Sequence, residues 1–539
     1  MMEPIFNQSF HEIGDYLRSV FEPSAEQHKL EEKMDRLITD VINEMHGAPS
    51  VTSDTELELI PLMGQEIIIP EVPVHPEQYI SHLIREVVHH CINTSSPNFI
   101  GHMTSALPIF FRPLSRLLVA LNQNVVKVET SKSFTVLERQ TLAFMHRLVY
   151  SRCESFYTEH GQNLSSTLGV VTSGGTVSNL TALWIARNVA LHNQDTDVER
   201  DGYALALHKN GYQRGVIIGS SLMHYSFDKA ADVLGLGSDG VIRIDCDSRG
   251  RIDLVKLEKE IKACQKRGDR ILALIGIAGT TESGAIDPLV GMAELARTRD
   301  IHFHVDAAWG GPLLMSDVHA RKLRGIERAN TVTIDGHKQM YLPMGIGILL
   351  MKDPHAAARI EKTARYILRG GSLDLGRHSM EGSRSAMSVY MHAGLYLLGR
   401  EGYGYLLDEG IRKTHWMAKL LASHPAFELI GEPEINILTY RYIPASLREA
   451  VRSCTLRPEE HDRINRFNEL LQEMQSQQGD SFVSRTTLCG IEGMPKSVVV
   501  LRVILANPLT TEAHIQSVLK IQQEIAKDLE LSFKYNTDR

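Results

Sequence analysis

Short, continuous apolar runs recur along the middle of this 539-residue chain. They start near Leu168, Gly215, Ile271, Ile301 and Gly345. A strand that is apolar at every position is buried on both faces, which is typical of a parallel sheet covered by helices. Because helical patterns separate the runs, the sequence predicts an α/β domain with a mainly parallel central sheet between about residues 96 and 380.

Residues 1–95 have a different pattern, in which apolar residues recur at helical spacing. The helix predicted around residues 31–43 has one apolar face. This face consists of Met34, Leu37, Ile38 and Val41. Because such a face must be buried, we expect an N-terminal helical arm that packs against something else.

Beyond residue 380 the chain mixes long helical patterns with few strands. The clearest strand covers residues 497–505, and an amphipathic helix follows from Thr511 to Leu529. Because 539 residues exceed what one hydrophobic core usually serves, we expect a large domain with smaller parts around it. The predicted division is 1–95 for the helical arm and dimerisation segment, 96–380 for the large domain and 381–539 for a small α+β C-terminal domain.

Composition and charge restrict the partners of the chain. With 43% hydrophobic and 23% charged residues and a net charge of −8, nothing favours nucleic acid or an anionic membrane, so small molecules and a second copy are the expected partners. We expect neither a signal peptide nor a membrane span, because no window of about 18 apolar residues occurs. Because neither is expected, we expect a cytoplasmic location. The six cysteines show no Cys-x-x-Cys spacing, which argues against disulfides and thiolate zinc sites.

Lys338 and Asp306 form the most specific chemical pairing in the sequence. Lys338 follows the β-branched run Thr331–Ile334 and precedes a turn, so rigid structure is expected to hold its amine. Asp306 ends the apolar strand 301–305, at the sheet edge where ligands bind, and the small Ala308 leaves room for a flat ring. A lysine that forms a Schiff base and a carboxylate that meets a pyridine nitrogen serve pyridoxal phosphate (PLP) chemistry. A solvated surface lysine and a turn-capping aspartate are the alternatives.

The segment Ser173-Gly-Gly-Thr176 places a glycine turn between a strand and a helix predicted from Val177 to Ala190. Free N–H groups at such a helix start would bind a phosphate. Because the same residue types also form ordinary helix caps, the motif gains its meaning from Lys338 downstream.

The segment Gly235-Leu-Gly-Ser-Asp-Gly240 matches the Gly-x-Gly-x-x-Gly fingerprint of dinucleotide-binding folds. That fingerprint must follow a strand and begin a helix. Here it follows the helical stretch 228–234 and precedes the strand-like residues 241–244. We therefore interpret it as a turn from a helix to a strand.

Histidines supply one further candidate. His224 follows the strand near Val216 at the sheet edge, where its imidazole would stack on a cofactor ring; a structural histidine is the alternative. The other histidines, including His302-x-His304, show no zinc-ligand spacing on a recognisable scaffold, so no metal site is expected.

Five segments occur in an order that characterises one enzyme family. They are Thr172–Leu180, His224, Gly279–Pro288, His304–Trp309 and Gly336–Lys338. With them, the chain from about residue 90 onward resembles the group II PLP-dependent amino-acid decarboxylases, which include glutamate, aspartate, cysteine-sulfinate and aromatic amino-acid decarboxylases. Residues 98–108 and 122–131 look most similar to the bacterial aspartate 1-decarboxylases of this family.

The resemblance implies a fold, an assembly and a cofactor site. The fold is that of the fold type I PLP-dependent transferases, similar to aspartate aminotransferase. The assembly is an obligate homodimer with active sites at the interface and the N-terminal arm around the partner. Lys338 would bind PLP as a Schiff base, His224 would stack on its ring and Asp306 would pair with the ring nitrogen. The other expected cofactor residues are Gly175 and Thr176 at the phosphate, Thr281, Ala308 and His337 along the cofactor, and Asp287 in support near His224.

Three further residues concern catalysis and the substrate. By the same resemblance, Tyr366 is the mobile-loop residue that protonates Cα after carbon dioxide leaves, with surface packing as the alternative. Arg502 interrupts the apolar run 498–505, and a buried guanidinium needs an anion. The resemblance assigns it a substrate carboxylate, and an internal ion pair is the alternative. His102 is a candidate for the distal carboxylate, in a segment that departs from the animal glutamate decarboxylases.

We therefore expect PLP-dependent decarboxylation of an acidic L-amino acid, specifically of L-aspartate to β-alanine, a pantothenate precursor. Glutamate, cysteine sulfinate and aromatic amino acids are alternative substrates, because one methylene changes binding by only about 1–3 kcal/mol. A different PLP reaction such as transamination, and a non-catalytic PLP-binding or regulatory protein, also stay open.

Overall fold

The computed structural model describes residues 10–22, 24–48, 50–52, 69–364, 368–489 and 497–537. The chain forms two compact units. The central unit consists of residues 102–468 and 485–508, and the terminal unit consists of residues 1–101, 469–484 and 509–539. The linear division at residues 95 and 380 stays a prediction.

A seven-stranded sheet forms the core of the central unit. Its strands are β1 (Gly169–Thr172), β2 (Gly215–Ser220), β3 (Val241–Ile244), β4 (Arg270–Ile277), β5 (His302–Asp306), β6 (Thr331–Asp335) and β7 (Gly347–Met351). Their order is β1-β7-β6-β5-β4-β2-β3. Strands β3, β2, β4, β5 and β6 are parallel, whereas β7 is antiparallel to both of its neighbours. The expected mainly parallel α/β sheet is therefore confirmed.

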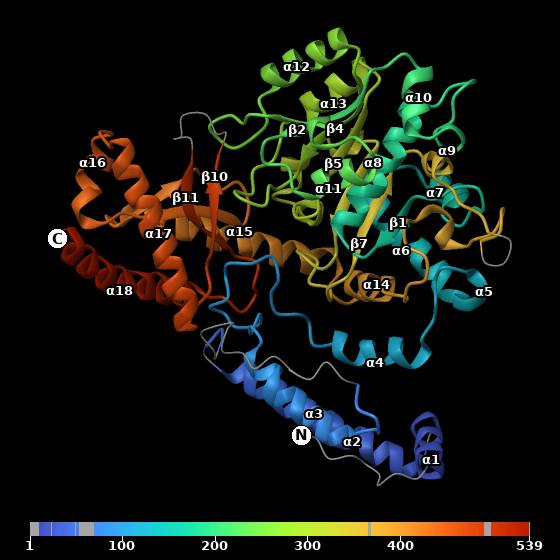
Figure 1. The fold of residues 1–539 in the computed structure, drawn as a ribbon, viewed down its shortest axis with the longest axis horizontal. Helices are drawn as coiled ribbons and strands as arrows, with labels where there is room; N and C mark the ends of the chain where they lie inside the picture. The colour runs from blue at the N-terminus through green and yellow to red at the C-terminus, as the bar shows by residue number, and fades with distance from the viewer. Residues whose placement is uncertain are drawn as a thin grey trace. The chain divides into compact units, whose positions relative to one another are not determined.

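Helices cover both faces of this sheet (Figure 1). On one face lie α6 (Ser133–Tyr150), α12 (Leu254–Arg267) and α13 (Leu289–Thr298), and on the other lie α8 (Gly175–Ala190), α10 (Tyr203–Lys209) and α11 (Ser226–Val233). Successive strand residues point to opposite faces. Val216 and Ile218 accordingly pack with the first group, and Ile217 packs with the second. Because all three side chains are fully buried, the run is apolar at every position.

The antiparallel pairing of β6 with β7 determines where Lys338 lies. Antiparallel neighbours can be joined by a short connection, whereas parallel neighbours need a crossover. Residues 336–346 make this connection directly after β6. Since β6 runs parallel to β5, Lys338 lies at the edge of the sheet where the parallel strands end.

The central unit also contains a four-stranded sheet in the order β10-β11-β9-β8. Its strands are β8 (Phe427–Ile430), β9 (Ile437–Tyr442), β10 (Ser484–Leu488) and β11 (Val498–Ile504). The strand expected at 497–505 is β11, which pairs with β9 in antiparallel register. The other helices are α4 (Phe111–Leu121), α5 (Val128–Ser131), α7 (Glu154–His160), α9 (Val198–Asp201), α14 (Ser388–Leu397), α15 (Gly399–Ser423), α16 (Arg448–Arg452) and α17 (Pro458–Gln478), whose last residues belong to the terminal unit.

The terminal unit joins residues from both ends of the chain. Its helices are α1 (Phe10–Phe21), α2 (Ala25–Gly47), α3 (Pro76–Glu86) and α18 (Glu512–Thr537). The N–H of Val51 donates to the carbonyl of Gly479 at 2.7 Å, and the rings of Phe99 and Phe482 stack with centroids 5.1 Å apart. The helices expected around residues 31–43 and from Thr511 are therefore present as α2 and α18. In the described part of the chain, no helix has both the length and the apolarity needed to cross a membrane.

The segment Gly235–Gly240 is a turn, as its context predicts. It lies between the end of α11 and the start of β3, with one 3₁₀ turn at Ser238–Gly240. Gly235 and Gly237 have φ angles of +78° and +69°, the left-handed region that favours glycine. The interpretation as a helix-to-strand turn is confirmed.

Candidate active site

A cavity of about 330 Å³ opens at the carboxyl ends of the parallel strands. Residues that end or follow β1, β2, β4, β5 and β6 form its wall. Eight of the predicted site residues line it: Gly175, Thr176, His224, Thr281, Asp306, Ala308, His337 and Lys338. This is the edge at which open α/β sheets bind ligands.

Lys338 is held in place at the cavity wall. Its side chain is 19% exposed, and its Nζ atom lies 3.1 Å from Oδ2 of Asp335, the last residue of β6. The Asp335 carboxylate is almost fully buried. This environment differs from that of a solvated surface lysine, which was the alternative to a functional role.

Three buried side chains fix the turn that carries Lys338. Trp309 Nε1 donates to Asn436 Oδ1 at 3.0 Å, and Asn436 Nδ2 donates to Gln339 Oε1 at 2.9 Å. Gln339 Nε2 donates in turn to the carbonyl oxygen of Trp309 at 2.8 Å. This closed ring of hydrogen bonds links the segment after Asp306 to the residue after Lys338, and so restricts the spacing between the two.

Asp306 lines the cavity with 8% of its surface exposed. Its Oδ1 accepts the N–H of Ala308 at 3.0 Å, and its Oδ2 accepts the side-chain amide of Asn179 at 2.9 Å. Among the described residues, no ion pair with Asp306 is found. Neutral donors therefore stabilise this carboxylate, and its charge is available to a cationic group in the cavity.

The start of α8 offers backbone N–H groups to the same cavity. Its N-cap residue Gly174 has a φ of +151° and provides no side-chain cap. Within the described residues, the N–H groups of Gly175 and Thr176 have no acceptor. Such groups at a helix start bind phosphates. A Cβ atom on Gly175 would lie 2.9 Å from Oδ2 of Asp335, so a side chain here would disturb the partner of Lys338.

His224 lies after β2 and is half-buried. The N–H of Ser226 donates to its Nδ1 at 3.2 Å, which places the ring proton on Nε2. Burial lowers the pKa of His224; the negative charge of Asp306 opposes this shift and the positive charge of Lys338 adds to it. The result is a neutral, oriented imidazole that can stack on a flat ring.

Asp287 is a predicted site residue that does not line the cavity. It is buried, its Oδ1 accepts the N–H of Ile252 at 2.8 Å, and its Oδ2 accepts the N–H of Ile277 at 2.9 Å. Burial raises the pKa of Asp287 to about 7, although both N–H donors act in the opposite direction. In this position Asp287 anchors the end of β4, and its predicted support of the cofactor near His224 stays a prediction.

Arg502 and His102 lie outside the cavity wall. Nη1 of Arg502, on β11, donates to the carbonyl oxygen of Thr281 at 2.8 Å, and Thr281 lines the cavity. Burial lowers the pKa of Arg502, while Glu282 opposes the shift. The pKa of His102 is also lowered by burial, although its side chain reaches the surface, and the positive charges of Arg502 and Lys338 lower it further. Arg502 therefore places its guanidinium beside the cavity.

Tyr366 lies outside the described residues. Its predicted role as a proton donor to Cα stays a prediction.

Two residues of the site were not predicted from the sequence. Asp335 ends a β-branched strand just as Asp306 ends an apolar one, so the same signal, a carboxylate at the end of a strand, identifies it. Asn179 gives no such signal, because a helical asparagine resembles a surface residue until the fold brings it to Asp306.

The residues of this cavity fit PLP. The amine of Lys338, the carboxylate of Asp306 and the free N–H groups at the start of α8 match an aldehyde, a ring nitrogen and a phosphate. Among the described residues, no cluster of three or more His, Cys, Asp or Glu side chains is arranged to hold a metal ion.

Sequence comparisons agree with this geometry. A family model described as the pyridoxal-dependent decarboxylase conserved domain matches residues 61–443. The chain is 44% identical over 468 residues to an aspartate 1-decarboxylase of Aliivibrio fischeri, with 86% of each chain covered. It is 27% identical over 496 residues to an L-2,4-diaminobutyrate decarboxylase of Rhizobium meliloti, covering 91% of this chain and 90% of the relative.

Solved structures share the fold. Mouse CSAD superposes with a TM-score of 0.81 at 24% identity and covers 94% of this chain and 100% of its own. Oryza sativa TDC, solved with PLP and tryptamine, has a TM-score of 0.80 at 18% identity and covers 94% of this chain and 99% of its own. At these identities the likeness concerns the fold alone, and it confirms the expected fold type I architecture.

Proposed function

Since the chain belongs to the pyridoxal-dependent decarboxylase family, whose members use PLP to decarboxylate amino acids, we propose that its substrate is L-aspartate and that its amine product is β-alanine. The observation that carries this proposal is the high identity with the Aliivibrio fischeri aspartate 1-decarboxylase over most of both chains. The Rhizobium meliloti relative, named for a different amino acid, is much less similar. A supply of β-alanine would serve pantothenate synthesis.

Different residues of the cavity would bind different parts of PLP. When bound, PLP accepts the electron pair that stays at Cα as carbon dioxide leaves. Lys338 supplies the amine that holds the cofactor aldehyde, and Asp306 pairs its carboxylate with the ring nitrogen. Gly175 and Thr176 bind the phosphate with their N–H groups. His224 would lie on the ring face, and Thr281, Ala308 and His337 would lie along the cofactor. Asp287, which does not line the cavity, would support them through the end of β4.

The substrate site is proposed beside this cavity, where Arg502 places its guanidinium. Arg502 binds a substrate carboxylate, and His102 contacts the distal one. The bond from Arg502 to Thr281 supports this assignment, because it ties the guanidinium to a cavity residue. An internal ion pair remains the alternative for Arg502, and Glu282, which acts on its pKa, is the candidate partner. Tyr366 then protonates Cα.

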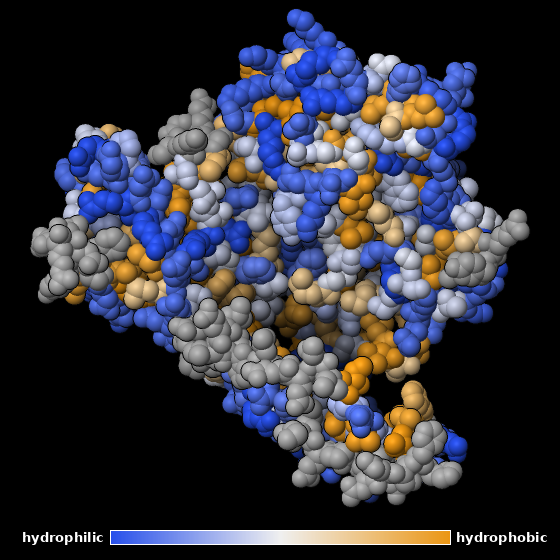
Figure 2. Space-filling model, in the orientation of Figure 1, coloured by the Kyte–Doolittle hydropathy of each residue, from blue (hydrophilic) through white to orange (hydrophobic). Residues whose placement is uncertain are grey.

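We propose a homodimer with the surface around α4 at its interface. Ile109 is 73% exposed and Val119 is 78% exposed, and Figure 2 shows hydrophobic residues over α4. Met344 lines the cavity and is itself 62% exposed. Soluble monomers rarely expose apolar side chains in groups, so a second copy is the expected cover.

The assembly can be tested by light scattering on the eluting protein. The wild-type chain should have the mass of a dimer, and Val119→Asp should shift it towards the monomer. Val255→Asp on α12, where the valine is 79% exposed, is the control and should leave the mass unchanged. A monomeric wild-type protein would contradict the proposal.

A cytoplasmic location is proposed on the cysteines. All six, Cys91, Cys153, Cys246, Cys264, Cys454 and Cys489, are free thiols, as is usual in a reducing compartment.

The deciding experiment is carbon dioxide release from L-aspartate, L-glutamate, cysteine sulfinate and L-2,4-diaminobutyrate, with the amine product identified. Preferential β-alanine formation supports the proposal, and a higher kcat/KM with any other substrate overturns the aspartate assignment. A keto acid formed without carbon dioxide indicates transamination, and PLP binding without any product indicates a non-catalytic protein. Lys338→Ala should abolish turnover, because no other amine among the described residues lines the cavity.

A further inference from the structure

Two histidines of β5 have no role in the chemistry described above. His302 and His304 alternate with Asp306 along the strand, so all three side chains point to the same face of the sheet. Burial lowers the pKa of His304 to about 4 and that of His302 to about 3, so both rings are neutral at pH 7.

A continuous chain of hydrogen bonds connects these histidines to Asp306. His302 Nε2 lies 2.8 Å from Thr331 Oγ1, which lies 2.9 Å from His304 Nδ1. His304 Nε2 lies 3.1 Å from Oδ1 of Asn179, and Asn179 Nδ2 donates to Asp306 Oδ2 at 2.9 Å. This chain of hydrogen bonds therefore passes through β5, β6 and α8, and it ends on the Asp306 carboxylate, which lines the cavity.

The chemistry of the groups sets the direction of every bond. A carboxylate only accepts, so Asn179 presents its NH₂ group to Asp306 and its oxygen to His304. His304 must then carry its proton on Nε2, which leaves Nδ1 to accept the hydroxyl proton of Thr331. The Thr331 oxygen in turn accepts the Nε2 proton of His302. Each donor points towards Asp306.

We propose that Asn179, His304 and Thr331 are positioning residues that hold Asp306 against the ring nitrogen of PLP. Aligned hydrogen bonds in a dry interior polarise one another, so the chain strengthens the donor that reaches the carboxylate. Because these groups are neutral, they fix the carboxylate without cancelling its charge. A lysine or arginine in the place of Asn179 would compete with the ring nitrogen for the same anion. This inference rests on the role proposed for Asp306.

Thr331 offers a test with a matched control on the same strand. Thr331→Val removes the hydroxyl of the chain while keeping the shape of the side chain. Thr333→Val makes the same change two residues away, where the buried hydroxyl has no hydrogen-bond partner among the described residues. Thr331→Ser keeps the hydroxyl and should restore the wild-type behaviour.

Two measurements on purified protein decide the matter. The first is the dissociation constant of PLP. The second is the ¹⁵N chemical shift of bound PLP labelled at the ring nitrogen, which reports the protonation of that atom. We expect Thr331→Val to weaken PLP binding by about 5- to 10-fold, roughly the loss of one hydrogen bond, and to shift the ¹⁵N signal towards the unprotonated form.

The result that overturns the inference is a Thr331→Val protein that matches Thr333→Val in both measurements. Asp306→Asn separates this failure from a failure of the proposed function. If Asp306→Asn leaves the ¹⁵N signal unchanged, Asp306 does not pair with the ring nitrogen, and its role in the proposed function is refuted. If Asp306→Asn shifts the signal but Thr331→Val does not, only the positioning role of the hydrogen-bond chain is refuted.

Discussion

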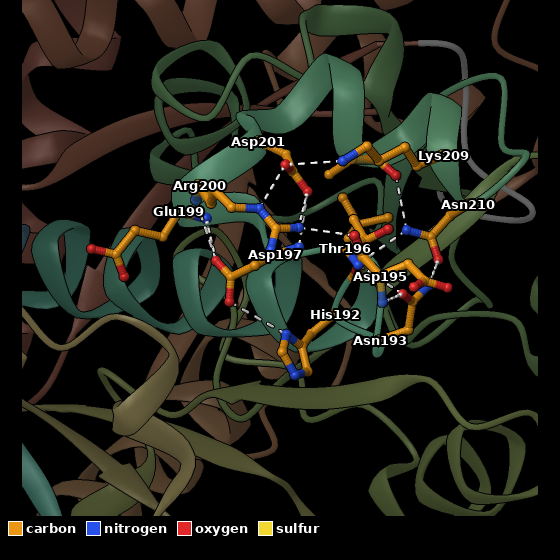
Figure 3. A network of polar contacts seen from close by, with 12 residues as sticks. His192, Asn193, Asp195, Thr196, Asp197, Glu199, Arg200, Asp201, Lys209 and Asn210 are labelled. Carbon is orange, nitrogen blue, oxygen red and sulfur yellow. Dashed lines mark hydrogen bonds and ion pairs between the residues drawn. The ribbon is translucent and has the colours of Figure 1, made fainter.

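Two polar networks of the central unit use the same types of side chain in opposite surroundings. One is the buried chain of Asp306, Asn179, His304 and Thr331. The other lies at the surface around α9, between α8 and α10 (Figure 3). It contains His192, Asn193, Asp195, Thr196, Asp197, Glu199, Arg200, Asp201, Lys209 and Asn210.

The surface network has more charges, but its stability depends less on each single bond. Asp201 pairs with Arg200 at 2.9 Å and with Lys209 at 3.0 Å, and these cations lower the pKa of its carboxyl group. Arg200 is exposed, so water can replace a lost partner and salt can screen its charge. In the buried chain, Asn179, His304 and Thr331 are shielded from water, so an unmade bond there costs the full desolvation of the group. Burial, rather than the number of charges, therefore determines how much stability each bond of a network contributes.

The aspartates give the largest expected contrast. Asp306→Asn removes the anion proposed to pair with the PLP ring nitrogen, and we expect carbon dioxide release to fall by about 100-fold or more. Asp197→Asn makes the same change where the carboxylate accepts the N–H groups of Glu199 and Arg200 at a helix start. Its rate should stay within about 2-fold of wild type, since surface changes have small effects. Steady-state kinetics with saturating PLP measures both, and equal losses in the two variants would abolish the distinction.

The asparagines come next. Asn179→Leu removes one hydrogen bond each from Asp306, His304 and Ser226 at the centre of the hydrogen-bond chain. We expect a loss of about 3 kcal/mol in the free energy of unfolding. Asn193→Leu should cost only about 0.5 kcal/mol, because Asn193 is exposed and most surface substitutions have small effects. Urea denaturation of both proteins without PLP isolates stability from cofactor binding, and a loss under about 1 kcal/mol for Asn179→Leu would contradict the ranking.

The sequence predicts most of the buried framework and little of the network inside it. Apolar runs and their order are enough for the sheet, because a fully apolar strand has only one stable environment. Lys338 and Asp306 are predictable for a similar reason, since both follow such runs directly and so lie at the same edge of the sheet. The antiparallel direction of β7 is not visible in the pattern, because a buried strand is apolar in either direction.

Asn179 and His304 could not be predicted as parts of the site. Their function depends on a contact between residues that are 125 positions apart in the chain. The pattern His302-x-His304 gave no reason to connect the two rings to Asp306. Arg502 illustrates the intermediate case: its interruption of an apolar run predicts that it needs an acceptor, and the fold provides the carbonyl of Thr281.

Low pH tests the buried network, because it protonates His304. The pKa of His304 in the folded protein is about 4, below its ordinary value of 6.5, so its contribution to stability is present above pH 6.5 and is lost as the pH falls towards 4. His304→Gln keeps a donor and an acceptor but cannot titrate. We expect the stability gap between wild type and this variant to shrink by about 2 kcal/mol between pH 7.5 and pH 5.

His192 provides a matched control for the substitution of a histidine by glutamine. Its side chain is 32% exposed and lies 3.4 Å from Asp197. His192→Gln should therefore change the free energy of unfolding at pH 7.5 by no more than about 0.5 kcal/mol. Unfolding in urea at a series of pH values measures all three proteins. A gap for His304→Gln that stays constant with pH would mean that the buried ring does not titrate with unfolding.

The smallest effect on stability is expected from the loss of one ion pair in the surface network. Arg200 pairs with Asp201, and Arg200→Ala removes this pair while Lys209 continues to neutralise the aspartate. We expect the melting temperature to fall by about 1 °C at low ionic strength and not at all in about 1 M salt, where the Debye length is about 3 Å. Differential scanning calorimetry at both salt concentrations measures the shift. A fall of several degrees that persists in high salt would show that the pair of Arg200 with Asp201 stabilises the fold as strongly as a bond of the buried chain. The exposure of Arg200 would then not explain the difference between the two networks.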